Sequence, residues 1–376
     1  MLSQFVGVRN SNPVSLREAF KVWVKISLLS FGGPAGQIAV MHKTIVEEKN
    51  WVSEARFLHA LNYCMLLPGP EAQQLAIYIG WLMHRWIGGL IAGILFVLPG
   101  FFSILILSVV YALYQNVSFV EALFFGLKPV VISIVVAAVI RIGSKTLKTP
   151  VMVSLAVLSF IALFFFSLPF PVVIAVAALI GFVGGKISPQ NFEVGNSHAT
   201  KAGVPISDDD IVSRFETRAA PSHLRSLAVL VIFGTLWWAP IAFIYFFYGR
   251  NNVFTQEALF FSKASFVTFG GAYAVLAYIA QQAVETYGWL KPHEMVDGLG
   301  MAETTPGPLI QVVQFVGFMG AFRVAQAGGL GLSPVIAGVL ASGLTTWVTF
   351  VPCFLWIFLG APYIESLRNN KDLSRA

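Results

Sequence analysis

Residues 67–74, with the sequence LPGPEAQQ, interrupt an apolar run that extends from residue 57 to residue 81. Proline removes a backbone donor and clashes with the preceding helical turn, and glycine adopts backbone angles that other residues avoid. The Pro-Gly-Pro triplet therefore predicts that one helix ends here and that the next begins with Pro70 at its first position. The same triplet recurs at Pro306-Gly307-Pro308.

The apolar character of the chain extends far beyond this stretch. Of its 376 residues, 57% are hydrophobic and only 11% are charged, and its mean hydropathy is +0.76. Soluble domains carry about 25% charged residues, so we expect a polytopic, all-α membrane protein embedded in a lipid bilayer. The apolar runs are too long for the strands of an outer-membrane barrel, and no cleavable signal peptide is recognised before the first of them. A helix break in such a chain is tolerated where protein or a water-filled cavity encloses it.

No feature of the sequence predicts a cofactor, a metal site or an enzyme. The formal net charge of +6 fits the cytoplasmic excess of lysine and arginine in membrane proteins, and no basic cluster interleaved with aromatic residues indicates nucleic acid. Cys64 and Cys353 lie in apolar segments, without a Cys-x-x-Cys pattern or clustered histidines. Neither a Walker-type phosphate loop nor a Gly-x-Ser-x-Gly motif is found, which disfavours an ATP-driven pump or a hydrolase.

Four short segments make up the first part of the expected architecture. They cover residues 16–33, 34–48, 53–67 and 70–83. Each is shorter than the roughly 20 apolar residues that cross a bilayer, so we expect two broken or hairpin elements in place of four spans. Longer apolar runs follow at residues 86–114, 119–140, 151–168, 171–185, 227–248 and 330–362. The polar segment 186–225 is expected to be a cytoplasmic linker between two domains, 1–185 and 226–376.

The chain contains an internal repeat. Residues 25–73 align without a gap with residues 263–311, and 14 of the 49 positions are identical. Composition alone would give roughly three or four identities in a chain this biased, so we infer a duplication. The matched positions include both kinds of break: Phe31-Gly32-Gly33 aligns with Phe269-Gly270-Gly271, and Pro68-Gly69-Pro70 aligns with Pro306-Gly307-Pro308. Matched breaks in the two halves of a membrane chain are typical of a transporter core.

The distribution of basic residues predicts how the two repeats are oriented. The amino-terminal tail, residues 141–148, residues 186–225 and the carboxyl-terminal tail are the basic segments, and the positive-inside rule places all four in the cytoplasm. One expected span, residues 227–248, then separates the linker from the second repeat. We therefore expect an inverted-topology pair of repeats, with a substrate site at their interface near the middle of the membrane.

The helix breaks predict a binding site for an anion. Unpaired amide groups and the helix dipole place about half a positive charge at each helix start, and such starts hold phosphate and sulfate. Helices that begin at Pro34, Pro70 and Pro308 would direct three positive ends at one region. The alternative is that the breaks are kinks that serve packing, and the second repeat has Ala272 in place of Pro34.

Two pairs of repeated side chains join the breaks in this expected site. Lys25 and Lys263 occupy matched positions, and two ammonium groups in membrane segments would neutralise a dianion. The alternative is that each lysine reaches toward the membrane interface. Gln73 and Gln311 follow the two Pro-Gly-Pro breaks, and they either donate to an oxyanion or bond to neighbouring helices.

Two carboxyl groups beside the breaks, Glu71 and Glu303, are candidates for coupling transport to protons. Glu71 follows the first Pro-Gly-Pro break directly, and Glu303 precedes the second by three residues. A carboxylate in the first turn of a helix is stabilised by the dipole, so Glu71 also has a purely structural interpretation.

Three stretches resemble motifs of the chromate ion transporter family in its long, two-domain form. They are residues 30–34 (SFGGP), residues 67–76 with 78–81 (LPGPEAQQLA and YIGW), and residues 302–309 with 314–318 (AETTPGPL and QFVGF). Their order and duplication extend the resemblance over nearly the whole chain. The resemblance implies a protein of the bacterial-type cytoplasmic membrane that exports chromate, a tetrahedral dianion shaped like sulfate. The residues themselves predict only an anion.

Together these observations predict a secondary transporter that works by alternating access, with chromate or a similar oxyanion such as sulfate as its substrate. An anion channel of the same architecture is the first alternative. A membrane-embedded enzyme would need a nucleophile, a metal or a redox centre, and none is recognised in the sequence. The oligomeric state is left open, with a homodimer among the alternatives.

Overall fold

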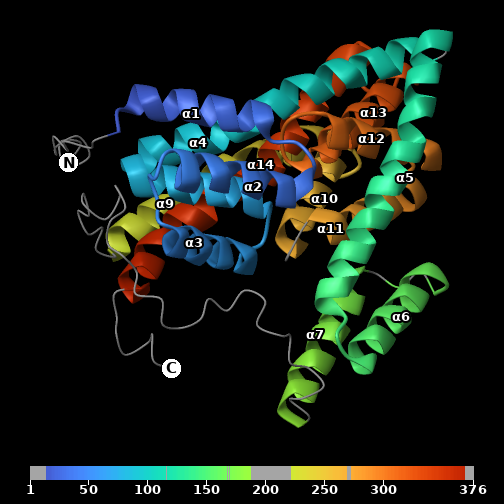
Figure 1. The fold of residues 1–376 in the computed structure, drawn as a ribbon. Helices are drawn as coiled ribbons and strands as arrows, with labels where there is room; N and C mark the ends of the chain where they lie inside the picture. Colours follow the sequence, from blue (N-terminus) through green and yellow to red (C-terminus); the bar gives the residue numbers. More distant parts are fainter. Residues whose placement is uncertain are drawn as a thin grey trace. The chain divides into compact units, whose positions relative to one another are not determined.

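The computed structural model describes residues 14–115, 117–166, 168, 170–187, 222–268 and 272–368. Most of the expected linker and residues 269–271, the second Phe-Gly-Gly break, lie outside this set. The described residues form helices and connecting turns without any strand (Figure 1). The expected all-α fold is therefore confirmed.

The elements follow the chain in two series. The first series is α1 (Leu16–Leu29), α2 (Gly33–His42), the π-helix η2 (Lys43–Glu48), α3 (Glu54–Leu66), α4 (Glu71–Tyr114), α5 (Ser118–Thr146), α6 (Pro150–Phe164) and α7 (Phe170–Ile187). The second series is α9 (His223–Tyr248), α10 (Val253–Val267), α11 (Ala272–Gln281), the π-helix η4 (Gln282–Thr286), α12 (Pro292–Thr304), the 3-10 helix η5 (Leu309–Gln311), α13 (Val312–Gln326) and α14 (Pro334–Arg368).

Four helical segments of the described chain are long and apolar enough to cross a membrane. They are Glu71–Tyr114, His223–Tyr248, Leu309–Gln326 and Pro334–Glu365. Two shorter apolar helices, Pro150–Phe164 and Val172–Ile187, accompany them. These lengths and compositions are those of a polytopic membrane protein, as the sequence predicts.

The first of these segments, α4, is a helical hairpin. His84 and Arg85 leave the helical region of backbone space, with φ of −135° and 54°, and they separate one arm, residues 71–83, from a second arm, residues 86–114. A Cβ atom placed on Gly93 would lie 2.5 Å from the side chain of Ile77, so the arms pack closely against each other. The break lies between the two predicted segments, which end at residue 83 and begin at residue 86.

The sequence repeat is also a repeat of structure. A shift of 238 residues carries both ends of α3 onto the ends of α12, and it carries the end of α1 onto the end of α10. It also relates Asn50 to Gly288. Both residues have positive φ, 51° and 64°, and each is the second residue after a π-helix, η2 and η4 respectively. The inverted orientation of the two repeats stays a prediction.

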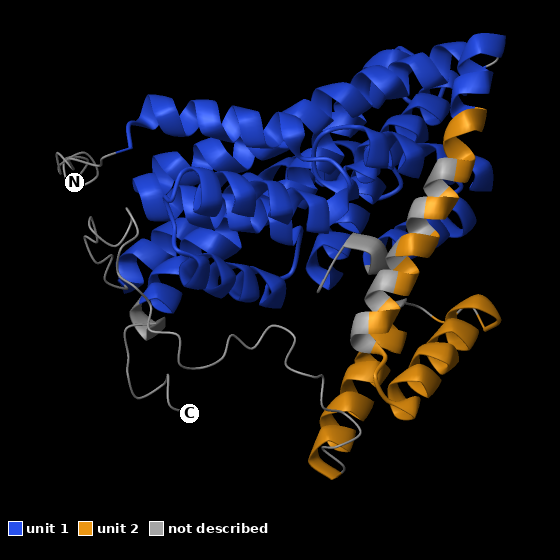
Figure 2. Cartoon of the chain, in the orientation of Figure 1, with its two compact units in different colours: residues 1–124, 206–376 blue, residues 125–205 orange. Residues whose placement is uncertain are grey.

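Contacts divide the chain into two compact units (Figure 2). The first comprises residues 1–124 and 206–376 and includes the broken helices of both repeats. Within it, α14 packs against α4, α9, α10 and α13. The second unit comprises residues 125–205, where α6 packs against α7. The predicted domain boundaries, at residues 185 and 225, follow the sequence repeat and stay predictions.

Candidate anion site

The two Pro-Gly-Pro breaks are each held by a residue of the other repeat. Gly69 donates its backbone N–H to the carbonyl oxygen of Thr268, with a nitrogen–oxygen distance of 2.8 Å, and Gly307 donates to that of Ser30 at 2.9 Å. The 238-residue shift relates Gly69 to Gly307 and Ser30 to Thr268, so the two bonds are equivalent. Reciprocal contacts of this kind indicate a two-fold relationship. Each Pro-Gly-Pro break therefore meets the residue that precedes the Phe-Gly-Gly break of the other repeat.

Backbone angle and space both require glycine at the centre of each break. Gly69 and Gly307 have φ of 115° and 120°, where residues with a side chain are rarely found. A Cβ atom on Gly69 would lie 3.1 Å from Cys353 Sγ, and one on Gly307 would lie 3.0 Å from the Cα atom of Gly100. The two long helices α14 and α4 thus pack directly on the breaks.

The helices after the Pro-Gly-Pro breaks begin one residue later than the sequence predicts. Pro70 and Pro308 are N-cap residues with extended backbone, at ψ of 104° and 132°. The first helical residues are therefore Glu71 and Leu309. Helix α2 begins at Gly33, with Pro34 in its first turn. First-turn amide groups at such starts favour an anion.

Gln73 and Gln311 are fully buried beside these helix starts. The Nε2 atom of Gln73 donates to the carbonyl oxygen of Gly93 at 3.4 Å, and that of Gln311 donates to Val97 at 3.4 Å. Both side chains therefore tie the helix after the break to the second arm of α4. Within the described chain their Oε1 atoms have no hydrogen-bond partner. A half-turn of either amide would present its donor group in place of that oxygen.

Two further glutamines, which the sequence did not single out, bond to the breaks. Gln37 Nε2 donates to the carbonyl oxygen of Gly307 at 2.5 Å, and Gln74 Nε2 donates to that of Pro68 at 2.7 Å. Both side chains are buried. The one sequence signal that could have drawn attention to them is a polar residue inside an apolar segment, which does not by itself predict burial. Gln37 has no glutamine partner in the repeat, because the matched residue is Val275.

Lys25 and Lys263 do not join the residues that the breaks bring together. Both side chains are exposed on the surface of the first unit. Lys25 Nζ lies 3.0 Å from Glu48 Oε2, and this hydrogen bond holds the pKa of Glu48 below its usual range. The predicted contact of either lysine with an anion stays a prediction.

The two predicted coupling carboxyls lie beside different breaks. Glu71 is the first residue of α4, and Glu303 lies in the last turn of α12. Both are buried. A carboxylate at the start of a helix occupies the same positive end that an anion would use, so the charge of Glu71 bears directly on anion binding.

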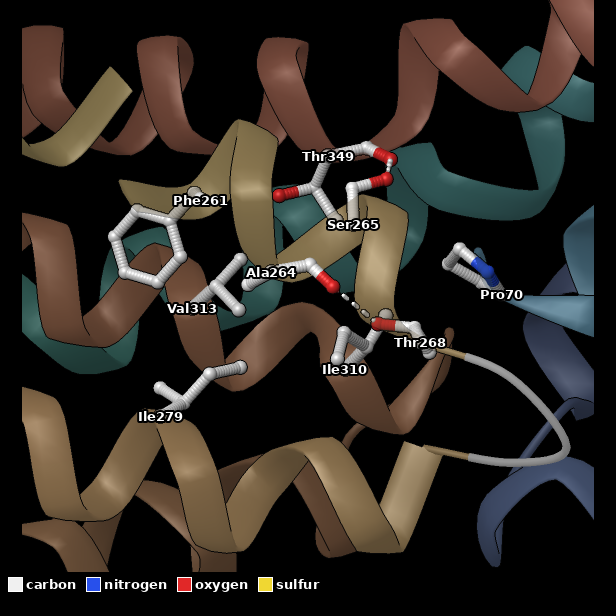
Figure 3. A pocket seen from close by; sticks show the side chains of 9 residues that line it. All are labelled: Pro70, Phe261, Ala264, Ser265, Thr268, Ile279, Ile310, Val313 and Thr349. Carbon is white, nitrogen blue, oxygen red and sulfur yellow. Dashed lines mark hydrogen bonds between the residues drawn. The ribbon is translucent and has the colours of Figure 1, made fainter. Parts of the chain in front are cut away.

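A narrow pocket lies beside the first break (Figure 3). It is lined by Pro70, Phe261, Ala264, Ser265, Thr268, Ile279, Ile310, Val313 and Thr349. The hydroxyl of Ser265 donates to the carbonyl oxygen of Thr349 at 3.2 Å, and that of Thr268 donates to the carbonyl oxygen of Ala264 at 2.7 Å. The space between these side chains is too narrow to admit a water molecule. The pocket is therefore closed in this conformation.

The apolar helices are interrupted at matched positions in the two repeats, and each Pro-Gly-Pro break bonds to a residue of the other repeat. These features define a polytopic helical membrane protein with the architecture of broken-helix transporters. Residues 17–182 and 255–376 match the model of a protein family described as "Chromate transporter". The chain belongs to the chromate transporter family. This membership confirms the resemblance carried by the break motifs.

Three relatives extend the comparison over nearly the whole chain. The "Probable chromate transport protein" of Synechococcus elongatus is 26% identical, over 96% of this chain and 79% of the relative. The "Chromate transport protein" of Cupriavidus metallidurans is 25% identical, over 95% of this chain and 77% of the relative. The protein of the same description from Pseudomonas aeruginosa is 30% identical, over 96% and 76%. No solved structure matches the chain.

Proposed function

We propose that the protein is a secondary transporter that exports chromate across the cytoplasmic membrane by alternating access. The observation that carries the mechanism is the reciprocal pair of hydrogen bonds, from Gly69 to Thr268 and from Gly307 to Ser30. Family membership and the names of the relatives support chromate as the transported ion. The distribution of basic residues supports cytoplasmic positions for both termini.

The proposed site recognises chromate through backbone amide groups at helix starts, because a tetrahedral dianion suits converging N–H donors. The proposed contacts come from Lys25, Phe31, Gly32, Gly33, Pro34, Pro68, Gly69, Pro70 and Gln73 in the first repeat, and from Lys263, Phe269, Gly270, Gly271, Pro306, Gly307, Pro308 and Gln311 in the second. The starts of α2, α4 and η5 supply the positive ends. Sulfate has the same shape and charge, so selectivity between the two anions would depend on the size of the opened site.

The reciprocal bonds are the proposed gates of alternating access. In an inverted pair of repeats, equivalent contacts face opposite sides of the membrane. Breaking the bond from Gly69 to Thr268 would then open the site to one side, and breaking that from Gly307 to Ser30 would open it to the other. Both bonds are formed in the structure, so in this scheme neither gate is open, as is expected of a state between the two open states.

Glu71 is the proposed proton-coupling group of the site, with Glu303 as the second candidate. An ionised Glu71 would compete with chromate for the positive start of α4. Protonation would remove this competition, so chromate should bind more tightly as the pH falls. A Glu71→Gln protein should lose this dependence, and unchanged pH dependence would count against the role of Glu71.

Oxyanion flux in proteoliposomes, under imposed pH and voltage gradients, tests the proposed function. We expect saturable chromate flux that accumulates the ion against its gradient. Passive conductance without saturation would identify a channel of the same architecture instead. Equal rates for chromate and sulfate would assign a general oxyanion carrier, and absence of flux for both anions would overturn the proposal.

A further inference from the structure

One carboxyl group is fully buried away from the proposed anion site. Glu257 belongs to the second turn of α10, and no part of its side chain is exposed. Within the described segments neither of its oxygen atoms has a hydrogen-bond partner, and no charged side chain there offsets its burial. An ionised carboxylate in such surroundings is strongly unfavourable, so the group is a neutral acid in this conformation.

Glu257 lies where helix α13 has a glycine. A Cβ atom on Gly320 would lie 2.7 Å from Glu257 Oε1 and 3.0 Å from the ring of Trp289. The carboxyl group therefore rests directly on the backbone of α13, beside the indole ring. Arg323, one turn further along α13, donates to the carbonyl oxygen of Trp289 at 2.8 Å. This bond holds Trp289 in place beside the carboxyl group.

The first repeat fills the equivalent position without a carboxyl group. Continued beyond the aligned residues 25–73 and 263–311, the 238-residue shift relates Glu257 to Ala19 and Gly320 to Leu82, while Trp289 corresponds to Trp51 within the alignment. The first repeat pairs a small residue, Ala19, with a large apolar one, Leu82. The second repeat pairs a large acid, Glu257, with glycine. The first repeat therefore carries apolar residues alone at the two matched positions. A buried ionisable group that the fold does not need is a functional candidate.

The elements around Glu257 carry few ionisable groups. Helix α10 packs against α9, α11, α13 and α14. Arg323 on α13 is engaged by the carboxylate of Glu294. The remaining ionisable side chains that the structure describes on these elements and on η4 with its following turn are Lys263 on α10 itself, His223, Arg225, Tyr245 and Tyr248 on α9, Tyr278 on α11, Glu285 and Tyr287 near η4, and Cys353, Tyr363 and Glu365 on α14.

We propose that Glu257 is a proton-binding site whose protonation closes the contact between α10 and α13 and thereby makes the transport cycle depend on pH. When the contact opens, water enters, the O–H bond of the acid breaks and the proton passes to water, which leaves the carboxylate. Closure requires the carboxylate to take a proton back from water. Helix α10 ends at Val267, next to the residue whose carbonyl accepts the bond from Gly69, so movement of α10 acts on the first break. The consequence for transport rests on the proposed function, whereas the proton binding does not.

Infrared spectroscopy of the full-length protein tests the proton-binding step without any transported ion. We expect a protonated carboxyl signal at neutral pH that Glu257→Gln removes. The matched control is Glu285→Gln, which changes an exposed carboxyl and should leave the signal in place. An intensity of the protonated carboxyl signal that is unchanged in Glu257→Gln would overturn the proposal, because other buried carboxyl groups can contribute the remainder of the signal.

Chromate flux in proteoliposomes tests the consequence for transport. At saturating chromate, where a change in affinity does not show, the rate of the unmodified protein should change by about tenfold per pH unit over the range in which Glu257 titrates, as for one required proton. The saturated rate of Glu257→Gln should be nearly independent of pH over that range. The single variant Glu257→Met keeps a side chain of similar size without an ionisable group, leaves Gly320 in place, and should also lose the pH dependence. If both variants keep it while Glu71→Gln abolishes it, the proposal is wrong. If the unmodified protein carries no chromate, the transport function fails, and the infrared signal alone decides the role of Glu257.

Discussion

Gly307 is held by the first repeat through both of its backbone polar groups. Its N–H bonds to the carbonyl oxygen of Ser30, and its own carbonyl oxygen accepts a bond from Gln37 Nε2. At the matched break, Gly69 bonds to Thr268, but the residue equivalent to Gln37 is Val275, which has no side-chain donor. The second break is therefore tied to the other repeat by one hydrogen bond more than the first, and the two proposed gates are unequal.

Replacement of Gln37 by valine should make the two breaks alike. The carbonyl group of Gly307 would lose its partner in a buried place, which costs about 1–3 kcal/mol. Thermal unfolding should show this loss, and the balance between the two open states should shift toward the one that needs the second break released. The exposed Gln326 provides a control, since Gln326→Val should change stability by no more than about 0.5 kcal/mol. Equal effects of the two substitutions would contradict the unequal-gate interpretation.

Alanine in place of Gly69 or Gly307, the central glycines of the breaks, should destabilise the protein more than alanine in place of a glycine that has no close neighbours. Gly249 also has a positive φ, 79°, but a Cβ atom there would meet no atom within 4 Å. Gly249→Ala should therefore cost about 1 kcal/mol from backbone strain alone. In Gly307→Ala the new Cβ atom would also overlap with Gly100, which should lower the free energy of unfolding by about a further 1–3 kcal/mol. Unfolding midpoints that coincide for the two variants would show that the close approach is not required.

The exposed pair formed by Lys25 and Glu48 predicts a small, pH-dependent effect. Because the pKa of Glu48 is lowered in the folded protein, the pair stabilises the fold above the ordinary carboxyl pKa, and this contribution is lost as the pH falls through the lowered value. The difference in unfolding midpoint between the unmodified protein and Lys25→Gln should therefore vanish in acid. Both side chains are exposed, so the effect is small at neutral pH as well.

Substitutions of Lys25 and Lys263 distinguish a role at the protein surface from a role in anion binding. If Lys25 and Lys263 contact chromate as proposed, Lys25→Gln should reduce chromate flux more than Glu48→Gln, and Lys263→Gln should reduce it more than Glu47→Gln. Flux measurements in proteoliposomes make both comparisons. Equal losses within each pair would assign the lysines to the protein surface only.

Inversion of the repeats predicts opposite accessibility for two loop positions. Asn10 precedes the first repeat, and Asn251 lies between α9 and α10, one span after the linker. Cysteines introduced at these positions, with Cys64 and Cys353 replaced by alanine, should react with a membrane-impermeant thiol reagent from opposite sides. Reaction of both from one side would contradict the inverted topology.

Local patterns were sufficient to predict several elements of the fold but not their contacts. The predicted segment 53–67 corresponds to α3, and the boundary between 83 and 86 corresponds to the turn of the α4 hairpin, because proline, glycine and apolar runs act on the backbone nearby. The shift of 238 residues identifies matched residues. It does not say that Gly69 meets Thr268, since that pairing depends on how the two repeats pack.

The side chains whose burial the sequence did not predict share one cause. Lys263 lies in an apolar neighbourhood along the chain, yet it is exposed, because apolar neighbours in a membrane protein face either protein or lipid. Gln37 and Glu257 are buried, and their spacing along the helices gives no sign of it. Burial in such a chain is decided by packing against distant helices, which composition does not record.

Chromate binding to the purified protein, measured by equilibrium dialysis with radiolabelled ion, tests the central claim most directly, because it asks whether the paired breaks hold the anion. Gly307→Ala should bind chromate at least about tenfold more weakly than the unmodified protein, a difference of about 1.4 kcal/mol, while Gly249→Ala should bind it as the unmodified protein does. Unchanged affinity in Gly307→Ala, in protein shown to be folded, would contradict the account.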